Sequence, residues 1–386
     1  MRTRIAQVTL RFTPPGGIVT VVREMARRLR AEGDEVEVFA SDRAVLSPSD
    51  HTKDLSREVD GITVHRFPVR DAPFGNLNLG WLTGLTKALA ESGVDVIHAH
   101  NHRLAHVLEA ALASKRSGIP LVVTTYFHPA QRDERWPKRA MIRLADYGFG
   151  ASAYLVARAI IVQSEMEARL VGSFAPRGHI RIIPHGLDLA EWEHPEGDRP
   201  DGLQLPPEYF LYAGLVVRRK GIDHLIEALS RLSVSERRPL VILGRDLGER
   251  PAFQAMARRF GVADSILWCD PLPRSTYRAV VRGATALVLP SEWETFGLVL
   301  LDAMAARTPV IATRRGGMSE VLEDGRSGLL VPYGNPDALA GALRSVIADP
   351  VSTRTRVDHG SDHVAQMDWS TIARQYHALY REVADL

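Results

Sequence analysis

Residues 287–305 read Leu-Val-Leu-Pro-Ser-Glu-Trp-Glu-Thr-Phe-Gly-Leu-Val-Leu-Leu-Asp-Ala-Met-Ala. The apolar run 286–289 predicts a short buried strand, and Pro290 ends it because proline cannot donate to a sheet ladder. Good helix formers fill 297–306, so a helix is predicted to begin near 295–297 with Thr295 as its N-cap. This stretch therefore predicts a strand, a short polar loop and a helix in succession.

The start of that helix has the properties of an anion site. The backbone N–H groups of Gly297, Leu298 and Val299 are expected to point out of the helix end, where the macrodipole adds positive charge. Glu294 lies in the loop, and Asp302 lies about 7.5 Å further along the helix axis. One acid can then meet a sugar at the phosphate and the other a ribose. The alternative is an ordinary strand-turn-helix unit with a solvated glutamate and an exposed aspartate.

This stretch resembles the E-x7-E element of the retaining, nucleotide-sugar-dependent glycosyltransferases of family 4, which have the GT-B architecture. The resemblance implies that Glu294 contacts the donor sugar and Asp302 the nucleotide ribose, with Phe296 and the three residues after it also binding the donor. Asp302 stands where the family has a glutamate. Because its side chain is about 1.5 Å shorter, the ribose contact is expected to be longer or bridged by water.

The composition is that of a globular chain long enough for two domains. It has 386 residues, 45% hydrophobic and 24% charged, and a net charge of +2. That charge does not indicate a nucleic-acid partner. The single cysteine, Cys269, excludes an intramolecular disulfide and a cysteine-based metal site, and core packing is its expected role. With no signal peptide and no apolar run of 18 residues, a cytoplasmic protein, at most peripheral at the membrane, is expected.

The N-terminal half begins with a strand at 5–10, a helix at 18–30 and a second strand at 36–40. Gly16 and Gly17 precede the helix, where adjacent glycines suit a diphosphate or serve only the turn. They do not form G-x-G-x-x-G, which argues against a nicotinamide-dependent oxidoreductase. The family resemblance implies that Gly16 and Gly17 line the donor diphosphate.

Two further segments of this half resemble family positions near the substrates. His98 and His100 end a strand predicted at 95–100, and the resemblance favours a sugar or phosphate contact for His100. Their spacing does not indicate a zinc site. The strand after Pro120 has Tyr126 where the family usually has a catalytic-side histidine, and His128 lies two residues on. Because residues two apart on an extended segment share a face, both remain candidates.

Residues 132–149 combine five basic and three acidic side chains with several large apolar ones. Such a segment is typical of a surface helix at an acceptor cleft, and it can also lie on anionic lipid. Peripheral membrane contact through 132–149 is therefore one hypothesis, and an ordinary surface helix is the other.

The second half repeats the strand-loop-helix pattern after a linker at 193–207. A strand at 209–213 leads into a basic loop from Gly214 to Gly221, which is a sound place for a diphosphate or simply a solvated turn. The loop resembles the family's G-R-L-x-x-x-K-G, so Lys220 matches the family lysine. Leu215 replaces the family arginine, and Arg218 or Arg219 can supply the lost charge.

Other matches lie further along the chain. Asp270, Pro271 and Leu272 occupy the loop that passes the nucleotide base in the family. Residues 309–332 follow the family's P-V-I-A-T-x-x-G-G-x-x-E pattern and its continuation, with Gly316 and Gly317 expected near the donor sugar and Glu320 chiefly structural.

The whole pattern predicts an α/β chain of two Rossmann-like domains facing a cleft: residues 1–195, residues 207–365, and a C-terminal helix at 366–386 that returns to the first domain. The implied enzyme is a hexosyltransferase that moves a sugar from a nucleotide diphosphosugar to an unidentified hydroxyl acceptor with retention. No cofactor or metal is implied, because cations replace the metal and no Asp-x-Asp motif is placed at the cleft. The alternatives are a nucleotide-sugar epimerase of the same fold and a non-catalytic nucleotide-sugar or membrane-surface binding protein.

Overall fold

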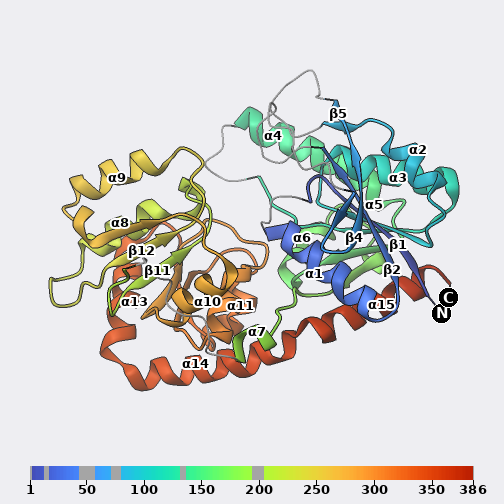
Figure 1. The fold of residues 1–386 in the computed structure, drawn as a ribbon. Helices are drawn as coiled ribbons and strands as arrows, with labels where there is room; N and C mark the ends of the chain where they lie inside the picture. Colours follow the sequence, from blue (N-terminus) through green and yellow to red (C-terminus); the bar gives the residue numbers. More distant parts are fainter. Residues whose placement is uncertain are drawn as a thin grey trace. The chain divides into compact units, whose positions relative to one another are not determined.

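The computed structural model describes residues 2–12, 17–42, 57–70, 80–130, 136–193 and 204–385. The chain divides into two compact units (Figure 1). Unit 1 comprises Met1–Gly186 together with Trp369–Leu386, and unit 2 comprises Leu187–Asp368. Each unit is built on a largely parallel sheet with helical crossovers, so the prediction of two Rossmann-like halves is confirmed.

The sheet of unit 1 has eight strands, and all neighbours are parallel except the last pair. In spatial order they are β10 (Ile180–Ile182), β9 (Ala159–Val162), β8 (Leu121–Thr124), β7 (Val96–His100), β1 (Arg4–Thr9), β2 (Glu35–Ser41), β4 (Ile62–Phe67) and β3 (Glu58–Val59). A separate small ribbon pairs β5 (Val69–Arg70) with β6 (Trp81–Leu82). Strands β7, β8 and β9 are buried along their whole length, because parallel strands are covered on both faces.

The sheet of unit 2 has six parallel strands. In spatial order they are β13 (Ile266–Cys269), β12 (Leu240–Leu243), β11 (Phe210–Ala213), β14 (Ala286–Leu289), β15 (Val310–Thr313) and β16 (Leu329–Val331). Counted within the unit, this order is 3-2-1-4-5-6, which is the doubly wound Rossmann arrangement.

Helices connect the strands in both units. Those of unit 1 are α1 (Gly17–Ala31), α2 (Leu85–Glu91), α3 (Ala105–Ser117), α4 (Trp136–Ala145), the π-helix η1 (Asp146–Gly150), α5 (Ala151–Tyr154), α6 (Glu165–Val171), η2 (Arg177–His179) and α15 (Trp369–Val383). Those of unit 2 are α7 (Ala190–Glu193), η3 (Arg218–Lys220), α8 (Ile222–Ser230), α9 (Arg250–Arg259), η4 (Ala263–Ser265), α10 (Arg274–Arg282), α11 (Leu298–Ala305), α12 (Met318–Val321), η5 (Glu323–Gly325), α13 (Pro336–Ala348), α14 (Pro350–Val364) and η6 (Ala365–Met367).

The amphipathic pattern of the first helix places it as the sequence predicts. Val21, Val22, Met25 and Leu29 of α1 are buried. The last helix, α15, packs against α1 and buries Tyr376 and Tyr380 in unit 1. Helix α2 begins at Leu85, after Gly84, whose φ of +91° lies outside the helical region.

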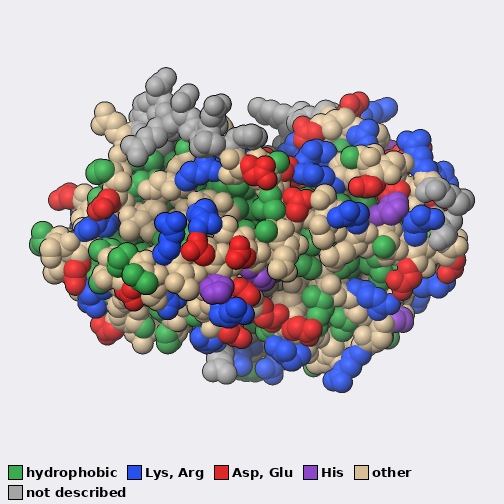
Figure 2. Space-filling model, turned by 90° about the horizontal axis from the view of Figure 1, so that it is seen from below, with side chains coloured by type: hydrophobic (Ala, Val, Ile, Leu, Met, Phe, Trp, Pro, Cys, Tyr) green, Lys and Arg blue, Asp and Glu red, His purple; other side chains and the backbone are tan. Residues whose placement is uncertain are grey.

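Figure 2 shows acidic and basic side chains interspersed over the face that it draws. In the part of the chain that the structure describes, no helix combines the length and the apolar character needed to cross a bilayer.

Strand order locates the ligand-binding edge of each unit. The order reverses between β1 and β7 in unit 1 and between β11 and β14 in unit 2. In open α/β sheets, ligands bind outside the carboxyl ends of the strands at such a switch point. The loops after these four strands are therefore where the site residues should converge.

Candidate active site

The loops after β11 and β14 meet through a glycine. Gly221 ends η3 with φ +71° and precedes α8, and a Cβ built there would lie 2.0 Å from the carbonyl oxygen of Pro290. Any other side chain would push the two loops apart. Since Gly221 follows Lys220 directly, this close approach carries Lys220 to the β14 loop.

Lys220 and Glu294 form the centre of the site. The Nζ of Lys220 donates to Oε1 of Glu294 at 2.5 Å, and the Oγ of Ser291 donates to the same oxygen at 2.7 Å. Both charged side chains are only about one-sixth exposed, at 16% and 17%. Neither Lys220 nor Ser291 donates to the other carboxylate oxygen, Oε2 of Glu294. The structure thus brings together two residues that lie 74 positions apart in the chain.

A glycine pair supports the loop that carries Glu294. Cβ atoms built on Gly316 and Gly317 would lie 1.9 Å from the carbonyl oxygen of Glu294 and 2.1 Å from that of Thr295. The N–H of Gly317 donates to the Glu294 carbonyl at 2.9 Å. These glycines pack against the backbone of the loop, and a side chain at either position would clash with a carbonyl oxygen of the loop.

The helix predicted after Glu294 is α11, with one correction at its start. The N-cap is Gly297, with φ +93°, and the helix begins at Leu298. The prediction of Thr295 as N-cap is wrong, because the left-handed conformation of Gly297 separates Thr295 from the first helical turn. Phe296 is buried in the core of unit 2, and Leu298 and Val299 are half-buried against it.

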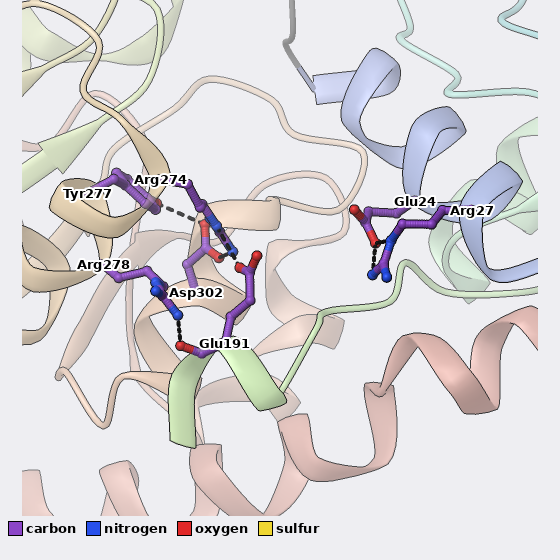
Figure 3. Close-up of polar contacts among 7 residues, drawn as sticks. All are labelled: Glu24, Arg27, Glu191, Arg274, Tyr277, Arg278 and Asp302. Carbon is purple, nitrogen blue, oxygen red and sulfur yellow. Dashed lines mark hydrogen bonds and ion pairs between the residues drawn. The ribbon is translucent and has the colours of Figure 1, made fainter. Parts of the chain in front are cut away.

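Asp302 is held by α10 (Figure 3). Its Oδ1 accepts from Nη2 of Arg274 at 3.1 Å, and its Oδ2 accepts from the hydroxyl of Tyr277 at 2.8 Å. Arg274 also donates through Nε to Glu191 of α7 at 2.9 Å. Burial raises the pKa of Asp302, and the Arg274 guanidinium opposes that rise. The exposed helix aspartate of the alternative interpretation is therefore wrong, since Asp302 is 7% exposed.

The two arginines of the basic loop differ in their surroundings. Both side chains are exposed. The N–H of Arg218 donates to Glu249, whereas the carbonyl of Arg219 accepts from the N–H of Glu292 in the β14 loop at 2.9 Å. Burial and the charge of Glu294 raise the pKa of Tyr212, and the charge of Arg219 opposes that rise. Arg219 therefore belongs to the same electrostatic environment as Glu294.

The other predicted donor residues lie in the loops after β11 and β13 and at the start of α1. Asp270 and Pro271 are exposed after β13, with Asp270 3.6 Å from Arg250, and Leu272 is half-buried. Gly214 follows β11 and donates to the Leu243 carbonyl. Gly16 lies outside the described residues, and Gly17 is the exposed first residue of α1.

A buried histidine cluster lies at the switch point of unit 1. His98 is 2.7 Å from both the Tyr380 hydroxyl and the Thr124 hydroxyl. His100 donates through Nε2 to Oε1 of Gln7 at 2.6 Å, and its ring lies 4.2 Å from that of His98. Both histidines are 0% exposed, so in this structure His100 packs inside unit 1. Burial lowers the pKa of His98 to about 3.

Tyr126 and His128 do not share a face as predicted. Strand β8 ends at Thr124, and Tyr126 has φ +44°, so the alternation of an extended chain does not continue through it. The Tyr126 ring stacks on His185 with centroids 5.6 Å apart, and its buried hydroxyl has no hydrogen-bond partner among the described residues. His128 is half-buried, with its ring 3.3 Å from the Pro129 carbonyl.

Backbone strain gathers at the same edge of unit 1. Asn101, Arg103 and Tyr126 are non-glycine residues with φ between +44° and +91°, and they follow the paired strands β7 and β8. Such conformations cluster at functional sites, where the surrounding structure holds them. The sequence contains no signal for this strain.

Three residues that contact the two acids of unit 2 were not predicted. The position of Ser291, three residues before Glu294, is only a weak signal for its bond to that glutamate. No sequence pattern indicates the contact of Arg274 and Tyr277 with Asp302.

Two family models and several known proteins match this chain. The family model described as glycosyl transferases group 1 matches residues 195–361, and that of glycosyltransferase family 4 matches residues 15–191. The D-inositol 3-phosphate glycosyltransferase of Nocardiopsis dassonvillei is 31% identical over 98% of this chain and 94% of its own. The glycogen synthase of Mycobacterium tuberculosis is 27% identical over 96% and 92% of the two chains.

Solved structures resemble the chain over its whole length. The sucrose-phosphate synthase of Thermosynechococcus elongatus has a TM-score of 0.77 and 25% identity, with 99% of each chain covered. The Anabaena protein HepE, solved with UDP-glucose, has a TM-score of 0.77 over 99% and 100% of the chains; at 19% identity it shows the fold alone. The chain belongs to glycosyltransferase family 4, the group 1 glycosyl transferases, and is a hexosyltransferase-type enzyme with the GT-B fold.

Proposed function

We propose that the protein transfers a sugar from a nucleotide diphosphosugar to an acceptor hydroxyl with retention at the anomeric carbon, without a metal ion. The observation that carries the proposal is the Lys220–Glu294 pair at the switch point of unit 2, beside the N-terminus of α11. A cation, a carboxylate and free helix amides at one sheet edge suit a diphosphate and the sugar attached to it.

Lys220 has the capacity to bind the diphosphate while it holds Glu294. An ammonium group has three N–H donors, and one of them is used by Oε1 of Glu294. The other donors, the charge of Arg219 and the amides at the start of α11 would stabilise the negative charge that develops on the leaving diphosphate. We assign the role of the missing family arginine to Arg219, because its backbone and its charge both reach the Glu294 loop.

The two acids have different tasks in this proposal. Oε2 of Glu294 would accept hydrogen bonds from sugar hydroxyls and orient the ring, while Lys220 and Ser291 fix Oε1. Asp302 already accepts one bond on each oxygen. Since a carboxylate offers about four lone-pair sites, a ribose hydroxyl can still bond to it beside Arg274 and Tyr277.

The acceptor side is proposed to lie at the strained edge of unit 1. Tyr126 carries a buried hydroxyl without a partner among the described residues, whereas the His128 ring already lies 3.3 Å from the Pro129 carbonyl. We therefore favour Tyr126 over His128 as the residue that replaces the family histidine.

The donor base can be tested by thermal unfolding with nucleoside diphosphates and their sugars. We expect one series to raise the melting temperature, because a ligand at about 100 times its Kd stabilises the folded state by about 2.7 kcal/mol. UDP is the first to test, since the Anabaena structures contain UDP or UDP-glucose. Lys220→Ala should abolish the shift, whereas Lys87→Ala, at an exposed position in unit 1, should keep it. No shift with any diphosphate would contradict the assigned donor site.

Retention and metal independence need a product-based test. With the donor found above and a panel of hydroxyl acceptors, we expect release of nucleoside diphosphate that EDTA does not reduce. Proton NMR of the first-formed product should show the anomeric configuration of the donor. An inverted product would overturn retention, and loss of turnover in EDTA that added Mg²⁺ restores would overturn metal independence. Affinity without diphosphate release on any acceptor would favour a binding role.

A further inference from the structure

Helix α4 of unit 1 exposes an unusual amount of apolar surface. None of its ten residues is buried. Eleven large apolar side chains are exposed among the described residues, and five of them lie within 136–155. Trp136 is 78% exposed, Leu144 75% and Tyr147 59%, with Met141 and Leu155 completing the group. This concentration marks an interaction surface, because scattered single residues would need no explanation.

The apolar stripe of α4 faces outward. At about 100° per residue, Trp136, Leu144 and Met141 lie near 0°, 80° and 140° around the helix axis. The opposite side carries Arg139 and Ile142, which are both half-buried. A surface helix of a globular protein ordinarily turns its apolar stripe to the core. In α4 the arrangement is reversed.

Within helix α4 itself, the charge beside the stripe is positive. Lys138 and Arg143 are exposed and flank the stripe at about 200° and 340°. Helix α4 contains no acidic residue. The first acid after it, Asp146, is buried, with its Oδ1 2.9 Å from Nε2 of His102 and 3.1 Å from Nη1 of Arg103.

The same contacts attach the helix firmly to unit 1. His102 is bonded on its other nitrogen to the Tyr154 hydroxyl at 2.6 Å. The π-helix η1 passes so close that a Cβ on Gly150 would lie 2.0 Å from the His102 ring. Both ends of η1 and Tyr154 of α5 therefore pack on one buried histidine, which anchors the segment that follows α4 inside unit 1.

We propose that α4 and η1 form a docking surface for anionic lipid. Trp136, Leu144 and Tyr147 would enter the boundary between headgroups and acyl chains, while Lys138 and Arg143 bind headgroup phosphates. Long basic side chains suit this position because their stems can lie along apolar surface with the charge in water. We choose anionic lipid over a protein partner because α4 carries basic residues and no acidic residue, which matches a surface of negatively charged headgroups.

Vesicle flotation tests the docking surface. The full-length protein should float with vesicles of equal parts phosphatidylcholine and phosphatidylglycerol at low salt, and much less with phosphatidylcholine alone. Added salt should weaken binding, since it screens exposed charges beyond about 10 Å at 0.1 M. Lys138→Gln with Arg143→Gln should weaken binding by roughly 30-fold, the effect of two lost basic charges near the surface.

The apolar part needs its own variant and a matched control. Trp136→Ser with Leu144→Ser should abolish flotation, whereas Val234→Ser with Val351→Ser should not, although those valines of unit 2 are 89% and 77% exposed. Unchanged circular dichroism and thermal unfolding would show that each variant is folded. Absence of flotation by the native protein would overturn the proposal. So would a stripe variant that alters only self-association in sedimentation velocity, since a second copy would then be the occupant.

Discussion

Lys220→Ala and Glu294→Ala should each lower turnover by at least ~100-fold, the scale of losing one group that stabilises charge in a transition state. Lys220 lies against Glu294 and has donors left for a diphosphate. The Lys220→Ala substitution removes the cation. It also leaves the Glu294 carboxylate without its charged partner at a position that is largely buried from solvent. The measurement is the initial rate of nucleoside diphosphate release at saturating donor and acceptor.

Conservative variants separate positioning from charge. Glu294→Gln keeps the length of the side chain and can still accept from Lys220, so it should retain more activity than Glu294→Ala. Lys87→Ala, at a position 77% exposed, should leave the rate unchanged. Rates equal to wild type in both Lys220→Ala and Glu294→Ala would contradict the assignment of this site. Loss of folding in a variant would be visible in its melting temperature and would not count as loss of catalysis.

Acidification from about pH 7 to 5.5 should destabilise unit 1 by about 3 kcal/mol. Burial lowers the pKa of His98 and His185 to about 3 and that of His106 to about 4, against 6.5 in the unfolded chain. The unfolded chain therefore binds more protons in this range, and each histidine costs about 1.4 kcal/mol of unfolding free energy per pH unit. The loss begins below pH 6.5 and ends near the folded pKa values.

One buried carboxyl acts in the opposite direction. Burial raises the pKa of Glu109 to about 7, so the folded state binds this proton more tightly and gains stability as the pH falls from 7 to the ordinary 4.5. Between pH 6.5 and 5.5, three histidines against one carboxyl leave a net effect of about two groups, or about 3 kcal/mol. His100 and His102, whose pKa values are also lowered by burial, add to the loss.

Calorimetry at the two pH values measures this effect as a fall in melting temperature of roughly 10 °C. His106→Gln is the matched variant, because its amide can replace Nε2 as donor to the His100 carbonyl at 2.7 Å. We expect this variant to show roughly half of the wild-type pH dependence. Equal unfolding free energies at pH 7 and 5.5 in the wild type would contradict the neutral, buried state of the histidines.

The sequence by itself determined the features that depend on neighbouring residues. The apolar run 286–289 became a buried strand, and the helix predicted at 18–30 became α1 with its apolar stripe facing inward, because strand and helix periods act locally. The glycine-bounded basic loop and the Glu294 loop were identified by short motifs. Their order along the chain also implied the two Rossmann-like halves, which the strand orders confirm.

Only the tertiary structure decided which of these residues act together. Strand order brings Lys220 to Glu294, Gly221 permits the approach, and packing places Asp302 against Arg274 and Tyr277. Local sequence patterns also did not predict that His100 is buried or that the apolar stripe of α4 faces solvent. Contacts between residues far apart in sequence depend on how strands are ordered and helices packed, and no local period encodes that arrangement.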